Sequence, residues 1–234
     1  MPQRKGSGAD PEASFFTPAL FKFLRDLKRH NDREWFNGNK DRFEADVKAP
    51  MLRFIGAFAG PLEQLNKNFL ADPRPVGGSM FRIHRDTRFA RDKSPYKLNV
   101  GAHFRHRLCT REVHAPGFYL HLQPGESFSA SGLWHPDPDA LRQVRGRIVS
   151  HAREWKKLRE GGIEVQGDTL ARVPQGFDPD HPWVDDLRLK DFYTFEPFSD
   201  QEVCAPDFLE RYAENCRGNL PLMGFLTKAM ELPW

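Results

Sequence analysis

Four short apolar segments follow one another in the middle of the chain with no helical pattern between them. This succession constrains the fold more than any other feature. The segments cover residues 80–83, 98–104, 117–122 and 127–134, and each has the length and apolar content of a strand. Pro124-Gly125 separates the last two as a hairpin turn would. Because consecutive strands without intervening helices pair with one another, the sequence predicts a central, mainly antiparallel sheet.

Helical patterns precede this strand region. Thr17 and Pro18 predict an N-cap and a first helical turn, and apolar residues recur behind them at helical spacing. Asn31 and Glu34 have the spacing of a capping box, in which two side chains bond the free backbone groups of the first turn. They therefore predict the start of a second helix. A third helix is expected over residues 50–65.

The rest of the chain mixes helices and short strands. Further predictions are a kink or break at Pro61, a long amphipathic helix over 137–158, short strands over 163–165, 170–173 and 192–195, and helices over 204–216 and 220–230. No repeat or low-complexity linker divides the chain. We therefore expect a single α+β domain over residues 15–234, with its sheet packed against N-terminal and C-terminal helices.

Composition narrows the class of protein. Hydrophobic residues make up 39% of the chain and charged residues 29%, which is too apolar for a disordered protein. Residues 1–14 have no apolar run, so they predict a disordered tail and no signal peptide. Cys109, Cys204 and Cys216 cannot all pair and lack CxxC spacing, which disfavours a disulfide scaffold. We expect a reduced, cytoplasmic setting and no contact with a membrane.

The net charge of +3 conceals two opposite charged regions. Residues 82–111 hold nine basic and two acidic residues, a local charge of +7. Residues 178–214 hold eleven acidic and three basic residues, a local charge of −8. The chain is therefore a charge dipole, and its small net charge does not exclude a phosphate or nucleic-acid partner. Either the two regions pair with each other or the basic one is left for an anion.

The basic segment, residues 82–97, carries the strongest functional signal. A strand, a polar loop and a returning strand would bring its cations together, and Asp86 and Asp92 would orient them. Tyr96 and His121 are the candidates for proton transfer. The same alternation of Arg and Asp also fits a purely structural ion-pair network, and the sequence leaves both readings open. The residues predicted to bind the ligand are Arg82, Arg85, Asp86, Arg88, Asp92, Lys93, Tyr96 and Lys97.

Other chemistries have weaker support. His103, His121 and His135 lie on or beside predicted strands, but no HxH, HExxH or CxxC pair accompanies them. We therefore predict no metal and no cofactor. Ser94 beside Lys93 lacks the turn that exposes a serine nucleophile, and a serine before proline is ordinarily a turn residue. No catalytic pair is recognisable, so the sequence leaves open whether the protein is an enzyme.

Several motifs resemble one known family. The central pair, residues 82–89 and 92–97, is the longest, and shorter ones lie at 31–40 and 132–134. Similar motifs follow at residues 172–177 and 180–182. In order and spacing they resemble an uncharacterised family of bacteria and fungi, catalogued as domain of unknown function 2461. The resemblance covers nearly the whole chain from Phe15 and implies a single-domain protein of this length. It implies no reaction, because the family has none established.

Two functions follow from these observations. The first is binding of a small phosphorylated or carboxylated ligand in a basic pocket formed by residues 82–97, with or without catalysis. The alternative is a non-catalytic module that binds nucleic acid or an acidic protein through the same basic face, since Phe81, Phe89, Tyr96 and Phe104 interleave with the cations. The first needs a concave pocket and the second an exposed basic stripe. The oligomeric state stays open.

Overall fold

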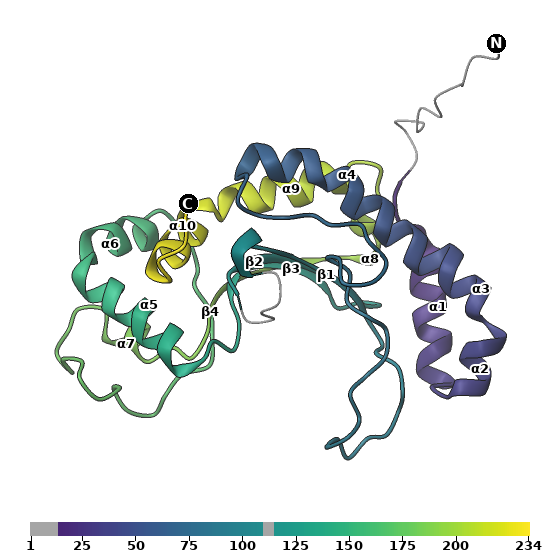
Figure 1. The fold of residues 1–234 in the computed structure, drawn as a ribbon, viewed down its shortest axis with the longest axis horizontal. Coiled ribbons are helices and arrows are strands. Elements are labelled where there is room, and N and C mark those ends of the chain that lie inside the picture. Colours follow the sequence, from purple (N-terminus) through teal and green to yellow (C-terminus); the bar gives the residue numbers. More distant parts are fainter. Residues whose placement is uncertain (1–13, 110–114) are drawn as a thin grey trace, which may run out of the picture.

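A four-stranded antiparallel sheet in the order β1-β2-β3-β4 forms the centre of the protein (Figure 1). The computed structural model describes residues 14–109 and 115–234. The strands are β1 (Val100–Arg105), β2 (Gly117–Leu122), β3 (Ser127–Leu133) and β4 (Phe192–Phe198). His121 of β2 lies opposite Gly101 of β1 and Phe128 of β3. Pro124-Gly125 forms the predicted turn, with Gly125 in the left-handed region at φ 73°. The α+β class is confirmed.

Helices cover one face of the sheet and extend past both of its sides (Figure 1). They are α1 (Pro18–Arg29), α2 (Arg33–Gly38), α3 (Lys40–Phe43), the π-helical η1 (Glu44–Lys48), α4 (Ala49–Leu65), the 3₁₀ turn η2 (Arg107–Cys109), α5 (Pro138–Ser150), α6 (Ala152–Glu160), α7 (Val184–Leu187), α8 (Asp200–Val203), α9 (Phe208–Gly218) and α10 (Leu220–Ala229). Within the described ranges, no helix is long and apolar enough to cross a bilayer.

The apolar side chains divide into two cores. In the larger one, α1, α4 and α9 pack on the inward residues of β1 and β2, and the ring of Phe58 lies 4.8 Å from Phe104 and 4.9 Å from Tyr212. In the smaller one, α5, α6 and α10 pack on the ends of β3 and β4, and Trp155 lies 4.8 Å from Phe225. Each fully buried aromatic contributes about 1.5–3 kcal/mol, so both cores stabilise the fold substantially.

A polar seam runs between the two cores on the helix-covered face. Ser127, Ser129 and Ser131 of β3 point inward, and each is nearly inaccessible to solvent. Ser129 donates a hydrogen bond of 2.5 Å to the Asn215 side-chain oxygen on α9. The apolar packing on β3 resumes only at Leu133, which belongs to the second core. The sheet is therefore continuous across both cores, whereas the apolar interior is not.

The opposite face of the sheet, called here the open face, carries no helix in the described part of the chain (Figure 1). Side chains alternate between the two faces along a strand. Phe118 and Leu120 are buried under the helices, so Tyr119 and His121 point to the open face. Tyr119, His121 and Phe128 are half-buried there, and Phe195 is 42% exposed. Aromatic rings thus line a face that is usually covered or polar.

The hairpin arm, residues 80–97, projects from the β1 side of the sheet (Figure 1). Its base joins β1 through the Phe81 N–H, which donates to the Gly101 carbonyl at 2.9 Å. Farther out its two limbs pair with each other, and the Lys97 N–H donates to the Ile83 carbonyl at 2.8 Å. Residues 80–83 therefore make one isolated bridge, from Met80 to Ala102, and not the predicted strand, because the chain turns away to pair with its own returning limb.

Three other predictions need correction. The helix over 137–158 divides into α5 and α6 at His151, whose backbone leaves the helical region at φ −121° and ψ 41°. Residues 163–165 and 170–173 form no strands; between them, Gln166 makes a single bridge to Tyr193 of β4, and Thr169 makes one to Leu189 before that strand. The helix over 204–216 begins only at Phe208.

The expected break at Pro61 is absent: Pro61 lies inside α4, which continues to Leu65. The predicted tail over 1–14 lies outside the described residues apart from Ser14.

We predict that Gly132→Ala lowers the free energy of unfolding by at least about 2 kcal/mol. Gly132 has φ 146°, and a Cβ atom there would collide with the Phe192 carbonyl oxygen on β4. Urea denaturation followed by circular dichroism measures the change. Gly146→Ala is the matched control, because a Cβ on this exposed turn of α5 meets nothing within 4 Å and should stabilise the helix by about 0.5–1 kcal/mol. Equal stability of the two variants would contradict the predicted collision between a Cβ atom at position 132 and the Phe192 carbonyl oxygen.

Candidate anion-binding site

The candidate site begins with the short helix α2. Asp32 is its N-cap, and the Asp32 carboxylate accepts a hydrogen bond of 2.8 Å from the Trp35 N–H. The predicted capping box at Asn31 and Glu34 is therefore wrong by one residue. Asn31 stays outside the helix because its side chain bonds the hairpin arm instead. Arg33 follows Asp32 as the first helical residue.

The Asn31 side chain clamps α2 to the hairpin arm. Its amide donates to the Tyr96 carbonyl at 3.0 Å and accepts from the Tyr96 N–H at 3.1 Å, as a neighbouring strand would. The Tyr96 ring stacks on Phe36 of α2, with centroids 4.1 Å apart and planes 17° apart. His84 packs on the same tyrosine ring at 5.2 Å. These contacts fix the returning limb of the arm against the helix.

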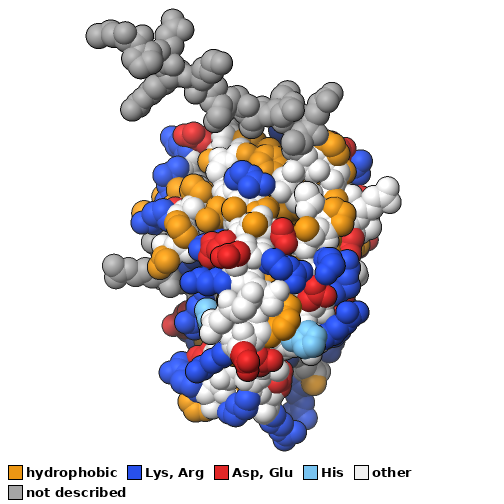
Figure 2. Space-filling model, turned by 90° about the vertical axis from the view of Figure 1, so that its right-hand side faces the viewer, with side chains coloured by type: hydrophobic (Ala, Val, Ile, Leu, Met, Phe, Trp, Pro, Cys, Tyr) orange, Lys and Arg blue, Asp and Glu red, His pale blue; other side chains and the backbone are white. Residues whose placement is uncertain are grey.

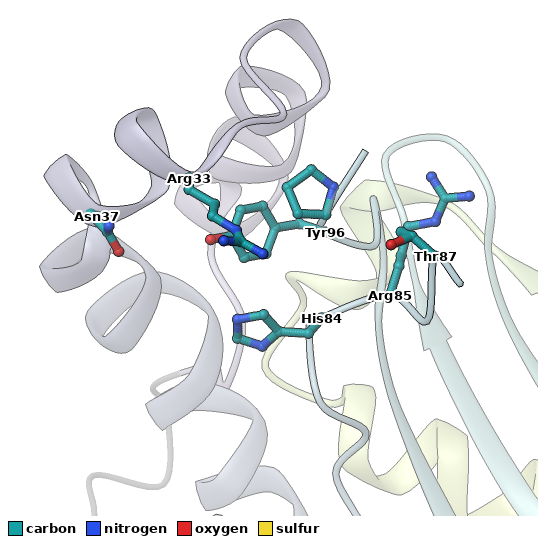
Figure 3. Close-up of a pocket in the computed structure, with 7 residues that line it drawn as sticks. Arg33, Asn37, His84, Arg85, Thr87 and Tyr96 are labelled. Atoms are coloured by element: carbon teal, nitrogen blue, oxygen red, sulfur yellow. The ribbon is translucent and has the colours of Figure 1, made fainter. Parts of the chain in front are cut away.

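A cavity of about 260 Å³ lies between α2 and the hairpin arm (Figure 3). Arg33 extends from α2 toward the Tyr96 ring, and His84 extends toward the same ring from the arm (Figure 3). Arg33 makes no salt bridge or hydrogen bond to any residue in the described ranges, so its guanidinium is available to a ligand. The cavity is lined by Arg33, Asn37, His84, Arg85, Thr87, Pro95 and Tyr96.

Of the predicted ligand-binding residues, Arg85 and Tyr96 line this cavity. The Arg85 guanidinium turns away from Tyr96 (Figure 3) and bonds Asp92 at 2.5 Å. Hydrogen bonds from the Ser94 hydroxyl and N–H, followed by the one from Arg85, hold the pKa of Asp92 well below its ordinary value. Arg85 thus adds positive charge to the cavity wall, but its Nη1 is already bonded to Asp92.

The tip of the arm forms its own ion pair. Asp86 accepts from Arg88 at 2.6 Å, and this bond lowers the pKa of the Asp86 carboxyl to about 2. The Lys93 ammonium donates to the Thr87 carbonyl at 3.0 Å. Phe89 is 95% exposed beneath the Arg88 guanidinium. Arg88 and Lys93 therefore lie outside the cavity, and each is held by a local contact.

Arg82 and Lys97 lie on another side of the arm, toward the open face. The Lys97 ammonium sits 5.2 Å from the centre of the Phe81 ring. Burial, and secondarily the charge of Arg82, lowers the pKa of Lys97. His121 is close enough for Lys97 to lower its pKa as well, although burial is the larger cause. The predicted site is thus divided between the cavity and the open face.

His121 belongs to a directed chain of hydrogen bonds. Gln123 donates its amide N–H to Glu126 at 2.7 Å, so its oxygen faces His121 Nε2 at 3.4 Å. A carboxylate only accepts, which places the imidazole proton on Nε2 and leaves Nδ1 to accept from the Tyr119 hydroxyl at 2.9 Å. Burial raises the pKa of Tyr119 to about 12. Burial lowers the pKa of His121, although the Gln123 hydrogen bond opposes this shift, and no nucleophile joins the ring among the described contacts.

The acidic region, residues 178–214, forms salt bridges with arginines of the described chain. Asp186, Asp200 and Glu202 of the acidic region pair with Arg159, Arg25 and Arg211, all outside 82–111. On the visible, described surface over α1 to α3, Lys and Arg side chains lie among Asp and Glu side chains and form no continuous basic patch (Figure 2). Local pairs therefore compensate most of the charge on this side.

Sequence reasoning missed Arg33, the unpaired cation of the cavity. It lies about fifty positions before the basic segment, in a stretch that is not itself basic. The motif at residues 31–40, one of those that resemble the family, contains Arg33 and was the available signal for its role. For metals, no group of three or more His, Cys, Asp or Glu side chains gathers within the ranges 14–109 and 115–234.

The sequence profile of a family described as "Conserved hypothetical protein (DUF2461)" matches residues 19–225. The chain belongs to this family. The match includes α2, the whole hairpin arm and all four strands, so it confirms the resemblance drawn from the motifs. The description of DUF2461 names no reaction or ligand. No curated protein and no solved structure matches the chain.

In this DUF2461 chain, we predict that Asn31→Ala lowers the free energy of unfolding by about 1–3 kcal/mol, the effect of losing two partly buried hydrogen bonds. Hydrogen exchange at the Tyr96 N–H should accelerate, because that donor then faces an empty site. Asn37→Ala changes an asparagine of α2 whose side chain has no hydrogen bond to a described residue, so it should leave both quantities unchanged. A Tyr96 exchange rate that does not respond to Asn31→Ala would exclude the clamp.

We also predict that Lys97→Ala raises the pKa of His121. Removing the ammonium relieves an unfavourable interaction with the imidazolium, so protonation becomes easier. NMR titration of the His121 ring protons measures the shift. Lys93→Ala removes the same charge from the tip of the arm and should not move the His121 titration. A similar shift in both variants would place Lys97 away from His121.

Proposed function

We propose that this protein binds a small phosphorylated or carboxylated ligand in the cavity between α2 and the hairpin arm. The observation that carries this proposal is the unpaired Arg33 guanidinium, which extends into a cavity whose other cation, Arg85, is already bonded to Asp92. An arginine presents a planar fork of N–H donors that matches the two oxygens of a carboxylate or phosphate. An anion would therefore fill a position that no described side chain fills.

Three further side chains support the same ligand class. The Thr87 hydroxyl and the Asn37 amide line the cavity, and neither side chain hydrogen-bonds to another described residue. His84 lies across from them and offers a ring N–H. Phosphate and carboxylate oxygens accept several such bonds at once, so these groups would fix the orientation of the ligand.

The dimensions favour a small ligand. Sites for drug-sized molecules usually have volumes of roughly 300–1,000 Å³. The cavity, at about 260 Å³, lies just below that range. It therefore suits an inorganic anion or a compact phosphorylated or carboxylated metabolite, with the Tyr96 ring as an apolar floor.

The arrangement supports binding better than catalysis. Tyr96 is the one predicted proton-transfer residue that lines the cavity, and His121 lies on the open face. No nucleophile and base stand together among the lining residues. The exposed tip of the arm is a poor basic stripe for nucleic acid or an acidic protein, because Asp86 and Asp92 each bond one of its arginines. The cavity is therefore the favoured site.

Thermal denaturation with increasing inorganic phosphate tests the proposal. Phosphate should raise the melting temperature by mass action, and Arg33→Ala should abolish most of that rise. Arg53→Ala is the matched control, since Arg53 is an exposed arginine of α4 that does not line the cavity. Acetate in place of phosphate distinguishes the two anion classes. The same rise in Arg33→Ala and in the unaltered protein would refute binding at this cavity.

A further inference from the structure

We infer that the ligand of the cavity between α2 and the hairpin arm is a small phosphate monoester with a hydroxyl-bearing body, and not a carboxylate. The inference rests on the proposed function, because it concerns the same site. Three features of the described residues carry it: hydrogen-bond donors on both walls of the cavity, a second positive charge besides that of Arg33, and room for more than an inorganic anion.

The hydrogen-bond donors of the cavity stand on both of its walls. Arg33 and Asn37 are four residues apart, so they lie on one face of α2, the face that borders the cavity. His84, Arg85 and Thr87 line the opposite wall, which the hairpin arm forms (Figure 3). An anion between the two walls is therefore within reach of N–H and O–H groups from two directions.

This arrangement matches a tetrahedral anion better than a planar one. The three terminal oxygens of a phosphate monoester point in different directions, so they can accept hydrogen bonds from both walls at once. A carboxylate has two oxygens in one plane, and the fork of a single arginine can bind both of them. A carboxylate bound in this way to Arg33 would direct its carbon substituent, and not its oxygens, toward the arm.

The charges at the cavity favour an anion with more than one negative charge. Among the described residues that line the cavity, none is acidic. Arg85 bonds Asp92 through Nη1, and its other N–H groups form no hydrogen bond to a described residue. A phosphate monoester carries a charge of about −1.5 to −2 at pH 7, whereas a carboxylate carries a single charge. Its additional charge would interact with Arg85 while Arg33 binds the same group from α2.

The cavity has room for a body attached to the phosphate. Its volume of about 260 Å³ corresponds to roughly nine water-sized groups, whereas phosphate has only five non-hydrogen atoms. Asn37 lies about 6 Å beyond Arg33 along α2, and its side-chain amide forms no hydrogen bond to a described residue. An amide both donates and accepts, so it matches a neutral hydroxyl group better than a second anion. The body of the ligand would thus extend from Arg33 toward Asn37.

Chemical-shift titrations of the full chain by NMR test the inference. The probes are acetate, inorganic phosphate and glycerol phosphate, at constant ionic strength and at a mildly alkaline pH, where phosphate is mainly a dianion. We expect phosphate to bind at least about 10-fold more tightly than acetate, the effect of one further charge-assisted hydrogen bond. Glycerol phosphate should bind about 2-fold to 10-fold more tightly than phosphate, and Asn37→Ala should remove that advantage without weakening phosphate binding.

Arg85→Gln tests the second positive charge. It should weaken phosphate binding by about 10-fold and acetate binding much less. Arg88→Gln is the matched control, because Arg88 is also bonded to an aspartate of the arm but does not line the cavity. Thr87→Val keeps the shape of the side chain and removes only the hydroxyl, so it should fold normally and still weaken phosphate binding more than acetate binding.

The outcomes separate this inference from the proposed function. The absence of saturable binding by all three probes would refute the anion site itself. Equal affinity for acetate and phosphate, with both lost in Arg33→Ala, would leave the anion site standing and overturn the assignment to a phosphate monoester. Equal affinity for phosphate and glycerol phosphate would overturn the hydroxyl-bearing body. Equal effects of Arg85→Gln and Arg88→Gln would overturn the role given to the second charge.

Discussion

The pair of hydrogen bonds between the Asn31 side chain and the Tyr96 backbone determines where the functional surfaces lie. The two residues are 65 positions apart, and without this contact α2 and the hairpin arm would have only ring packing to hold them together. The amide supplies one donor and one acceptor, the same pair that a neighbouring strand offers. A single side chain thus takes the place of a strand and creates the wall of a cavity at the junction of helix and arm.

The acidic residues of the arm shape its surfaces as much as the basic ones do. Asp92 draws Arg85 outward, and Asp86 draws Arg88 to the tip, so neither guanidinium is free to face α2. Arg33 is left as the available cation of the cavity, and Lys97 remains beside the open face. The proposed anion site therefore centres on Arg33 of α2, whereas the structural ion-pair network holds Arg85 and Arg88 of the arm.

A strand could be predicted from the sequence where its own residues alternate between apolar inward and outward side chains. Phe118 and Leu120 point inward and Tyr119 points outward, as a period of two requires. The break in the helix at His151 was not predictable, because neither a glycine nor a proline marks the residue whose backbone leaves the helical region. The place of Arg33 in the cavity could not be predicted either. Its role follows from the position of α2, which depends on a contact with a residue far along the chain, and no local pattern encodes that contact.

The serine seam on β3 has a consequence for how the molecule loses its structure. The two cores share a sheet but have no continuous apolar interior, so they are linked by the backbone hydrogen bonds of β3 and β4 and by α10, whose Met223 packs in the larger core and whose Phe225 packs in the smaller one. Apolar contact is what usually makes a domain unfold as one cooperative unit. Here the lobe formed by α5, α6 and α10 can open as a separate unit while the larger core stays folded. Partial unfolding at the β4 side would leave the α2 cavity in place.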